Sequence, residues 1–221
     1  MKNIAIIPAR GGSKRLPNKN ILLLGDIPLI AHSILMAKKC SSIINEVYVS
    51  TDDDEIRNIA LSFGAKVIDR PIHLSGDTEP TVTALKNVLE NIDFSVENVF
   101  LLQPTNPLRP ESLVEDAFHI FQDNNADSLM TVTRNHQKFG KIVNNKFLPF
   151  NYKIGQRSQD LEPLFFENGL LYIIKAELIL QEKIIGDNHF PMIINHLFAN
   201  VDIDTQEDFD YANYLYHKYK I

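Results

Sequence analysis

Residues 3–20 are NIAIIPARGGSKRLPNKN, and this stretch decides the fold. An apolar run, residues 4–7, ends at Pro8 and leads into a loop with two glycines, a serine and four basic side chains: Arg10, Lys14, Arg15 and Lys19. A buried strand that opens into a glycine-rich, cationic loop presents backbone N–H groups and positive charge to phosphate. Because ligands bind at the carboxyl ends of strands in open α/β sheets, we expect a polyphosphate site here rather than a merely solvated loop.

The composition is that of an ordinary globular protein, with 221 residues, 44% hydrophobic and 23% charged. The net charge of −6 argues against a nucleic-acid partner and makes the basic loop a local anion site. Cys40 is the one cysteine, which excludes an intrachain disulfide, and its apolar helical surroundings predict a buried thiol. No apolar run approaches the length of a membrane span or a signal peptide, so we expect a cytoplasmic protein with no membrane partner.

Strand-like and helix-like segments alternate through the first 133 residues, which predicts parallel βαβ units with right-handed crossovers and an α/β fold. Strands are expected at residues 4–7, 45–50, 66–68, 98–102 and 128–133, and helices at 27–39, 53–63, 80–91 and 111–123.

The alternation stops at about residues 135–167, where a hairpin turn expected at Asn144-Asn145-Lys146 predicts an antiparallel excursion within a single domain of residues 1–221. Further strands are expected at 170–174, 193–197 and 200–203, and a closing helix at 205–219. Thr205 and Asp208 form a weak capping box for that helix.

Three constellations follow the expected strands. In the first loop, Arg10 and Lys19 suit a polyphosphate, and the backbone of Gly11, Gly12 and Ser13 suits a close approach. Neither the Walker A pattern nor the G-x-G-x-x-G dinucleotide pattern is present, so kinase and dehydrogenase functions lose their main support.

The second constellation is Gln103-Pro104-Thr105, where a carboxamide can read a base edge or, alternatively, close the strand end. The third is Val201-Asp202-Ile203-Asp204, whose two carboxylates would point the same way from an extended segment and suit Mg²⁺ shared with phosphates. The alternative is capping of the last helix. We interpret a competing acidic run, residues 52–54, as helix N-terminal charge.

The stretches IIPARGGSKRLPNKN, VYVSTDDDEI, LLQPTNPLR, ENGLLYI and VDIDTQEDF occur in an order that resembles the acylneuraminate cytidylyltransferases, the CMP-sialic acid synthetase family. The resemblance covers nearly the whole chain. It implies a Rossmann-like α/β nucleotidyltransferase core with a mostly parallel sheet and flanking helices. It also implies that the excursion at about 135–167 helps to build a homodimer.

The resemblance assigns roles residue by residue. Arg10, Ser13 and Asn20 would contact CTP, Lys19 would stabilise the leaving pyrophosphate, and Asp202 and Asp204 would hold Mg²⁺. Residues that would meet the cytosine or the sugar acid are Arg70, Gln103, Thr105, Lys141, Arg157 and Asn168. Arg157 resembles an arginine that reaches the sugar carboxylate, from the same or the partner subunit, and a guanidinium fork fits a carboxylate.

The sequence departs from the family pattern at Arg15, where glycine is usual, at Asn106, where serine is common, and at Phe166-Glu167, where an arginine often stands. The Arg15 loop resembles the related 3-deoxy-manno-octulosonate cytidylyltransferases. These departures concern the acceptor sugar rather than the reaction.

The expected reaction transfers CMP from CTP to the anomeric hydroxyl of a nine-carbon 2-keto sugar acid and releases pyrophosphate. One alternative is a cytidylyltransferase for another acidic sugar, such as a 3-deoxy-octulosonate. The other is a nucleotide-binding module without catalysis.

Overall fold

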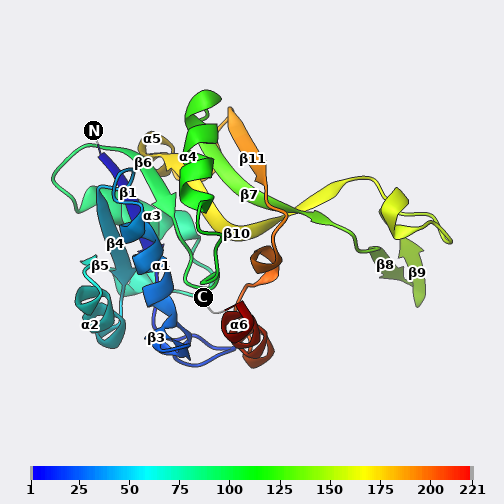
Figure 1. Ribbon diagram of the computed structural model, residues 1–221, viewed down its shortest axis with the longest axis horizontal. Helices are drawn as coiled ribbons and strands as arrows, with labels where there is room; N and C mark the ends of the chain where they lie inside the picture. The colour runs from blue at the N-terminus through cyan, green and yellow to red at the C-terminus, as the bar shows by residue number, and fades with distance from the viewer. Residues whose placement is uncertain (1, 220–221) are drawn as a thin grey trace.

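The structure, a computed structural model, describes residues 2–219 and is built on one seven-stranded sheet with the order β11-β7-β10-β6-β1-β4-β5 (Figure 1). The strands are β1 (Lys2–Pro8), β4 (Glu46–Thr51), β5 (Lys66–Asp69), β6 (Val96–Leu101), β7 (Ser128–Asn135), β10 (Leu164–Lys175) and β11 (His189–Ile193). Only β10 runs antiparallel to its neighbours, β6 and β7. The expected mostly parallel α/β fold is confirmed.

The chain reverses its direction across the sheet at β1, and this reversal positions the site. From β1 the chain crosses to β4 and β5 on one side, and it returns to β6 on the other side of β1. The loops after β1 and β6 therefore leave the same sheet edge side by side. A crevice at such a switch point is where open α/β sheets bind their ligands.

Helices cover both faces of the sheet. One face carries α1 (Leu29–Lys39), α2 (Asp54–Ser62) and α4 (Leu113–Asp123), and the other carries α3 (Thr81–Glu90) and α5 (Ala176–Leu180). Residues 4–7 of β1 are 0% exposed because alternate side chains enter the two cores, which explains their continuous apolar run. A third core joins the first loop to α6 (Gln206–Tyr219).

Short elements complete the chain: β2 (Leu23–Leu24), β3 (Ile27–Pro28), and the 3-10 turns η1 (Lys19–Ile21), η2 (Ile72–Leu74), η3 (Ser158–Asp160) and η4 (Leu197–Asn200). Cys40 is buried at 3% exposure, as predicted, and burial raises the pKa of its thiol. Among residues 2–219, no helix has the length and apolar character needed to cross a membrane.

The C-terminal strand predictions were wrong. The edge strand is β11 (His189–Ile193) rather than residues 193–197, and η4 follows it. Pro191 is tolerated because an edge strand need not donate every N–H group. Residues 200–203 form no strand; the Ile203 N–H instead donates to the Thr105 carbonyl, 2.8 Å away.

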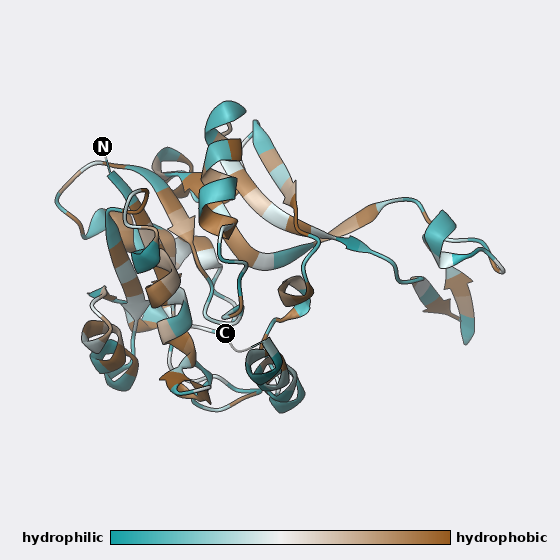
Figure 2. Cartoon of the chain, viewed as in Figure 1, coloured by the Kyte–Doolittle hydropathy of each residue, from teal (hydrophilic) through white to brown (hydrophobic). Residues whose placement is uncertain are grey.

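The break in the alternation corresponds to a projecting arm, residues 136–163, which Figure 1 shows extending away from the core. It contains the antiparallel hairpin of β8 (Gly140–Val143) and β9 (Lys146–Pro149). Asn144 and Asn145 both have positive φ, 49° and 59°, as a two-residue hairpin turn of type I′ requires. Figure 2 shows apolar positions on this hairpin, and Ile142 is 78% exposed.

Candidate active site

A cleft of about 510 Å³ lies at the carboxyl ends of β1 and β6, and we call it the phosphate cleft. Five basic side chains line it: Arg10, Lys14, Arg15, Lys19 and Arg70. Ser13, Asn20, Gln103, Thr105 and Asp204 line it as well. The structure therefore brings together most of the predicted CTP-contacting residues, from the first loop, the end of β6 and the C-terminal segment.

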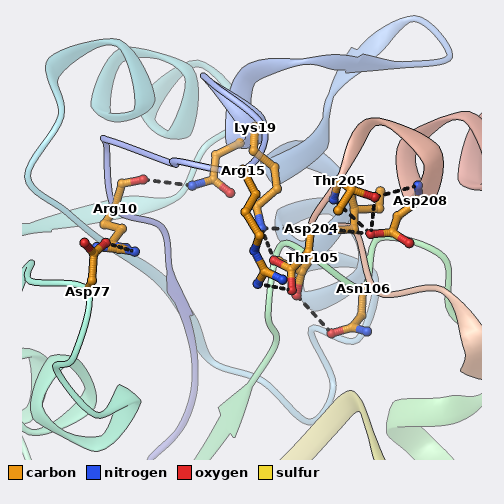
Figure 3. Close-up of polar contacts among 11 residues, drawn as sticks. Arg10, Arg15, Lys19, Asp77, Thr105, Asn106, Asp204, Thr205 and Asp208 are labelled. Atoms are coloured by element: carbon orange, nitrogen blue, oxygen red, sulfur yellow. Dashed lines mark hydrogen bonds and ion pairs between the residues drawn. The ribbon is translucent and has the colours of Figure 1, made fainter.

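Carboxylates of the same chain form ion pairs with the cations of the cleft (Figure 3). Arg10 Nη2 lies 2.7 Å from Asp77 Oδ1, and Lys14 pairs with the other oxygen of Asp77. These two cations, Lys14 first, lower the pKa of the Asp77 carboxyl. Sequence reasoning did not single out Asp77, because nothing in its polar surroundings distinguishes it. In the structure, Asp77 is therefore the anion that Arg10 and Lys14 contact.

The second cluster links the first loop to the C-terminal segment. Lys19 Nζ donates to Asp204 Oδ1 and to the Ile203 carbonyl, both at 2.8 Å, and Arg15 Nη2 lies 2.6 Å from Asp204 Oδ2. The Lys19 side chain is 12% exposed, whereas that of Arg15 is 68% exposed. Arg15 therefore belongs to the cleft, although it stands at a position where the resemblance leads one to expect glycine.

The loop backbone is held by the chain itself. The Gly11 N–H donates to Asp52 Oδ1 at 2.9 Å, and the buried Asn20 amide donates to the Arg10 carbonyl at 3.0 Å. Asp53 caps α2 through the N–H groups of Glu55 and Ile56, as its interpretation as helix N-terminal charge requires. The Gly11 N–H, which we expected to face a ligand, therefore already donates to Asp52. The Asn20 side chain, predicted to contact CTP, holds the backbone of the loop in this structure.

Gly11 and Gly12 line two smaller hollows beside the phosphate cleft rather than the cleft itself. Gly12 has a φ of 64°, a left-handed backbone that glycine adopts without strain. Its role in the structure is to turn the loop.

Arg70 is 8% exposed and donates to the carbonyl and the hydroxyl of Ser50 at 2.7 and 3.1 Å. Burial lowers its pKa to about 10, and nearby Arg10 acts in the same direction. It lines the phosphate cleft, not the hollow described next, so the structure places this predicted sugar contact on the phosphate side.

The buried Arg109, which sequence reasoning missed, fixes the end of β6. Its guanidinium donates to the carbonyls of Leu170 and Gln103 and to the Ser33 hydroxyl, at 2.7, 2.8 and 3.0 Å. The backbone of Gln103 is thereby held, while its side-chain carboxamide makes no hydrogen bond to any residue in the described part of the chain. That carboxamide remains available to a ligand in the cleft.

A second hollow, of about 700 Å³, lies between the core and the root of the arm, and we call it the aromatic hollow. Its wall is formed by Phe139, Phe150, Phe165, Phe166, Glu167 and Asp202, with Leu164 and Asn168 among its other members. Asp202 thus faces the aromatic hollow, whereas Asp204, two residues later, faces the phosphate cleft. The two aspartates stand where the hollows adjoin.

Asp202 is exposed as a residue, but neighbouring protein partly removes its carboxyl from water. This desolvation raises the pKa of its carboxyl, a hydrogen bond from Thr105 opposes the rise, and the charge of Asp204 adds to it. Among residues 2–219 no cluster of three or more His, Cys, Asp or Glu gathers as a metal site. Two carboxylates beside a phosphate cleft nevertheless fit Mg²⁺, which usually takes one or two protein carboxylates and completes its shell with phosphates and water.

The aspartates are held in place by buried amides. Asn106, 0% exposed, donates to the carbonyls of Val201 and Asn168 at 2.8 and 3.0 Å. Gly169 allows this approach, because it has a φ of 72° and an added Cβ would lie 2.6 Å from Asn106 Oδ1. Thr205 and Asp208 form the expected capping box of α6, with the Thr205 N–H donating to Asp208 Oδ2 at 2.9 Å.

Three residues that the resemblance assigns to the sugar acid, Asn168, Lys141 and Arg157, have other contacts in the structure. The Asn168 side chain is 5% exposed and bonds Thr131, Thr133 and the Leu170 N–H, so it shapes the wall of the aromatic hollow from within the sheet. Lys141 and Arg157 lie in the arm and line neither hollow in this chain. Arg157 pairs with Asp160 at 2.8 Å, and Lys141 lies over the Phe150 ring.

Curated relatives match nearly the whole chain. It is 34% identical over 225 residues to the pseudaminic acid cytidylyltransferase of Campylobacter jejuni, covering 98% of this chain and 97% of that protein. It is 33% identical over 228 residues to the CMP-N,N'-diacetyllegionaminic acid synthase of Legionella pneumophila, covering 94% and 93%. It is 32% identical over 232 residues to the N-acylneuraminate cytidylyltransferase of Streptococcus agalactiae, covering 100% of this chain and 55% of that protein.

Among solved structures, the fold matches that of CMP:2-keto-3-deoxy-manno-octonic acid synthetase in complex with CTP. The TM-score is 0.74 at 18% sequence identity, covering 99% of this chain and 100% of the other. At that identity the likeness concerns the fold, and it agrees with a Rossmann-like nucleotidyltransferase core.

The switch-point cleft, its cations and the adjoining aspartates, taken with these relatives, define the class of the protein as an α/β nucleotidyltransferase. A family model described as cytidylyltransferase matches residues 4–220. The chain belongs to the cytidylyltransferase family.

Proposed function

We propose that the protein transfers CMP from CTP to the anomeric hydroxyl of a nine-carbon 2-keto sugar acid, in the cytoplasm, releasing pyrophosphate and forming a CMP-activated sugar. The observation that carries the proposal is the placement of Asp202 and Asp204 between the phosphate cleft and the aromatic hollow. The relatives support this class of acceptor, because their names refer to pseudaminic, diacetyllegionaminic and N-acylneuraminic acids.

The cations of the cleft bind the triphosphate. Arg10 and Lys14, now paired with Asp77, and Lys19 and Arg15, now paired with Asp204, have the positive charge that the β- and γ-phosphates require. Lys19 is the least exposed of the four, so water screens its charge least. It stabilises the charge that develops as pyrophosphate leaves.

Asp202 and Asp204 would hold Mg²⁺, which when bound neutralises phosphate charge. The acceptor sits in the aromatic hollow and its anomeric oxygen attacks the α-phosphorus. An O–P bond forms between the anomeric oxygen and the α-phosphorus, the bond from the α-phosphorus to pyrophosphate breaks, and the hydroxyl proton passes to water. Positioning and charge neutralisation suffice for such a transfer, so the enzyme needs no covalent intermediate.

The test is pyrophosphate release from each of the four NTPs with a panel of sugar acids and Mg²⁺. We expect release with CTP and a nonulosonate, and we expect Asp202→Ala to abolish it. Asp123→Ala, at the exposed end of α4, is the matched control and should retain wild-type turnover. Near-full activity of Asp202→Ala would contradict the metal assignment, and CTP binding without turnover of any acceptor would favour a non-catalytic module.

The arm adds a second part to the proposal: two copies of the chain form a homodimer through it. Phe139, Ile142, Phe147, Phe150 and Ile154 leave large apolar areas exposed on a segment that a second copy can cover. Arg157 would then meet the carboxylate of an acceptor held by the partner. Arg157→Ala should raise the KM for the sugar acid, and a rise in the KM for CTP alone would contradict this placement.

A further inference from the structure

Residues 72–80, between β5 and α3, form an exposed segment beside the phosphate cleft, and we call it the strap. Leu74, Gly76 and Asp77 of the strap line the cleft. None of the residues in the strap is buried, and Ile72 is 88% exposed. A segment that buries so little apolar surface opens readily, because few contacts with the core oppose the opening.

The strap is held by two cations of the first loop. Arg10 donates through Nη1 to the Ser75 carbonyl at 3.1 Å, and its Nη2 lies 2.7 Å from Asp77 Oδ1, a pair that Figure 3 shows. Lys14 pairs with the other oxygen of Asp77. Among residues 2–219, every other hydrogen bond of the strap goes to a residue within 71–84. Arg10 and Lys14 therefore provide the polar contacts that fasten the strap to the first loop.

The Asp77 carboxylate contacts these cations in the way that a phosphate group does. Each of its two oxygens meets a different cation, and carboxylates and phosphates share this pairing geometry. In the proposed function the same two cations bind the triphosphate. Because Arg10 uses both Nη1 and Nη2 on the strap, a phosphate takes these donors only when the strap releases them.

On the basis of the proposed function, we infer that Asp77 is an internal competitor of the triphosphate and that the strap opens when CTP binds. The β- and γ-phosphates take over Arg10 and Lys14, so the strap loses the contacts that fasten it, and the Asp77 carboxylate moves away from the negative charge of CTP. After the transfer, Asp77 competes with pyrophosphate for the same cations and thereby promotes its release. The CMP-sugar has no β- or γ-phosphate and escapes this competition.

The test is titration calorimetry with CTP, pyrophosphate and CMP, each with Mg²⁺ and without an acceptor sugar. Asp77→Asn should bind CTP and pyrophosphate about 3- to 10-fold more tightly than the wild type, because two partly exposed ion pairs no longer compete. The affinity for CMP should stay unchanged. Asp187→Asn, an exposed aspartate before β11, removes the same charge and is the matched control; it should bind all three ligands as the wild type does.

Asp77→Glu keeps the carboxylate and should retain most of the wild-type competition. Unchanged or weaker binding of CTP and pyrophosphate to Asp77→Asn would overturn the inference. The same gain for CMP, or an equal gain in Asp77→Glu, would overturn it as well, because neither result depends on competition for Arg10 and Lys14. A wild-type protein that binds neither CTP nor pyrophosphate would instead contradict the proposed function itself.

Discussion

Lys19 Nζ lies 2.8 Å from Asp204 Oδ1, although 185 residues separate the two in the sequence. The first loop and the segment before α6 thus meet in one charged cluster, and a third core that includes Leu16, Leu24, Val201 and Ile203 packs beneath it. The contact joins the residue expected to stabilise the leaving group to a residue expected to bind metal. Its disruption should affect catalysis more than folding.

Lys19→Met should lower kcat for pyrophosphate release by about 100-fold or more, because a nearly buried cation beside the phosphates is lost. Arg15→Gly removes the other partner of Asp204, but the Arg15 side chain is 68% exposed. We therefore expect a small rise in the CTP KM and a change in stability below about 1 kcal/mol. Steady-state kinetics and thermal unfolding measure both, and equal loss of kcat in the two variants would contradict this ranking.

Asn106→Ala should destabilise the protein by about 1–3 kcal/mol, because the carbonyls of Val201 and Asn168 lose their donor in a fully buried site. Activity should fall as well, since the same amide positions the segment that carries Asp202 and Asp204. Asn91→Ala, an exposed asparagine at the end of α3, is the control. Urea unfolding gives the free energy, and wild-type stability of Asn106→Ala would contradict the role of this network.

Glu46 makes folding pH-dependent. Lys2, Lys66 and Tyr48 hydrogen-bond its carboxylate and lower its pKa from 4.5 to about 2. A depressed carboxyl pKa stabilises the folded state above pH 4.5, and this stabilisation is lost as the pH falls toward 2.

Glu46→Gln should therefore lower the free energy of unfolding at pH 7 by roughly 1–2 kcal/mol. That estimate is well below the full shift, because the two lysine side chains are 45% and 62% exposed. Unfolding in urea at pH 7 and at pH 2.5 measures the difference, which should shrink at the lower pH. A difference that stays constant with pH would contradict the ionic origin of the effect.

Ile142→Asp should weaken self-association, because it places a charge in the apolar surface of the arm. Light scattering coupled to gel filtration should show a dimer for the wild type and a concentration-dependent monomer for the variant. Ile72→Asp is a suitable control, since Ile72 is 88% exposed on η2, outside the arm. A monomeric wild type, or a variant that stays fully dimeric, would contradict the proposed interface.

The sequence predicted the elements whose signals are local. The run at residues 4–7, the alternation of strands and helices, the hairpin turn at Asn144-Asn145 and the capping box of α6 each depend on neighbouring residues, and the structure contains them all. The strand predictions at 193–197 and 200–203 failed because short apolar segments near a sheet edge take their conformation from what they pack against. Residues 201–203 are held instead by contacts with Asn106, Thr105 and the third core.

For the site, the sequence by itself identified the side chains that we propose carry the chemistry: the cations of the first loop, Gln103, and the two aspartates. Only the tertiary structure decided which hollow each of these side chains lines and which partner it contacts. Asp202 and Asp204 face different hollows, Asp77 and Asp204 form ion pairs with the cations of the cleft, and the Asn20 and Asn168 side chains hydrogen-bond within the protein framework. The reason is physical: a residue type fixes what a group can bind, but the packing of segments distant in the chain fixes which partner it meets.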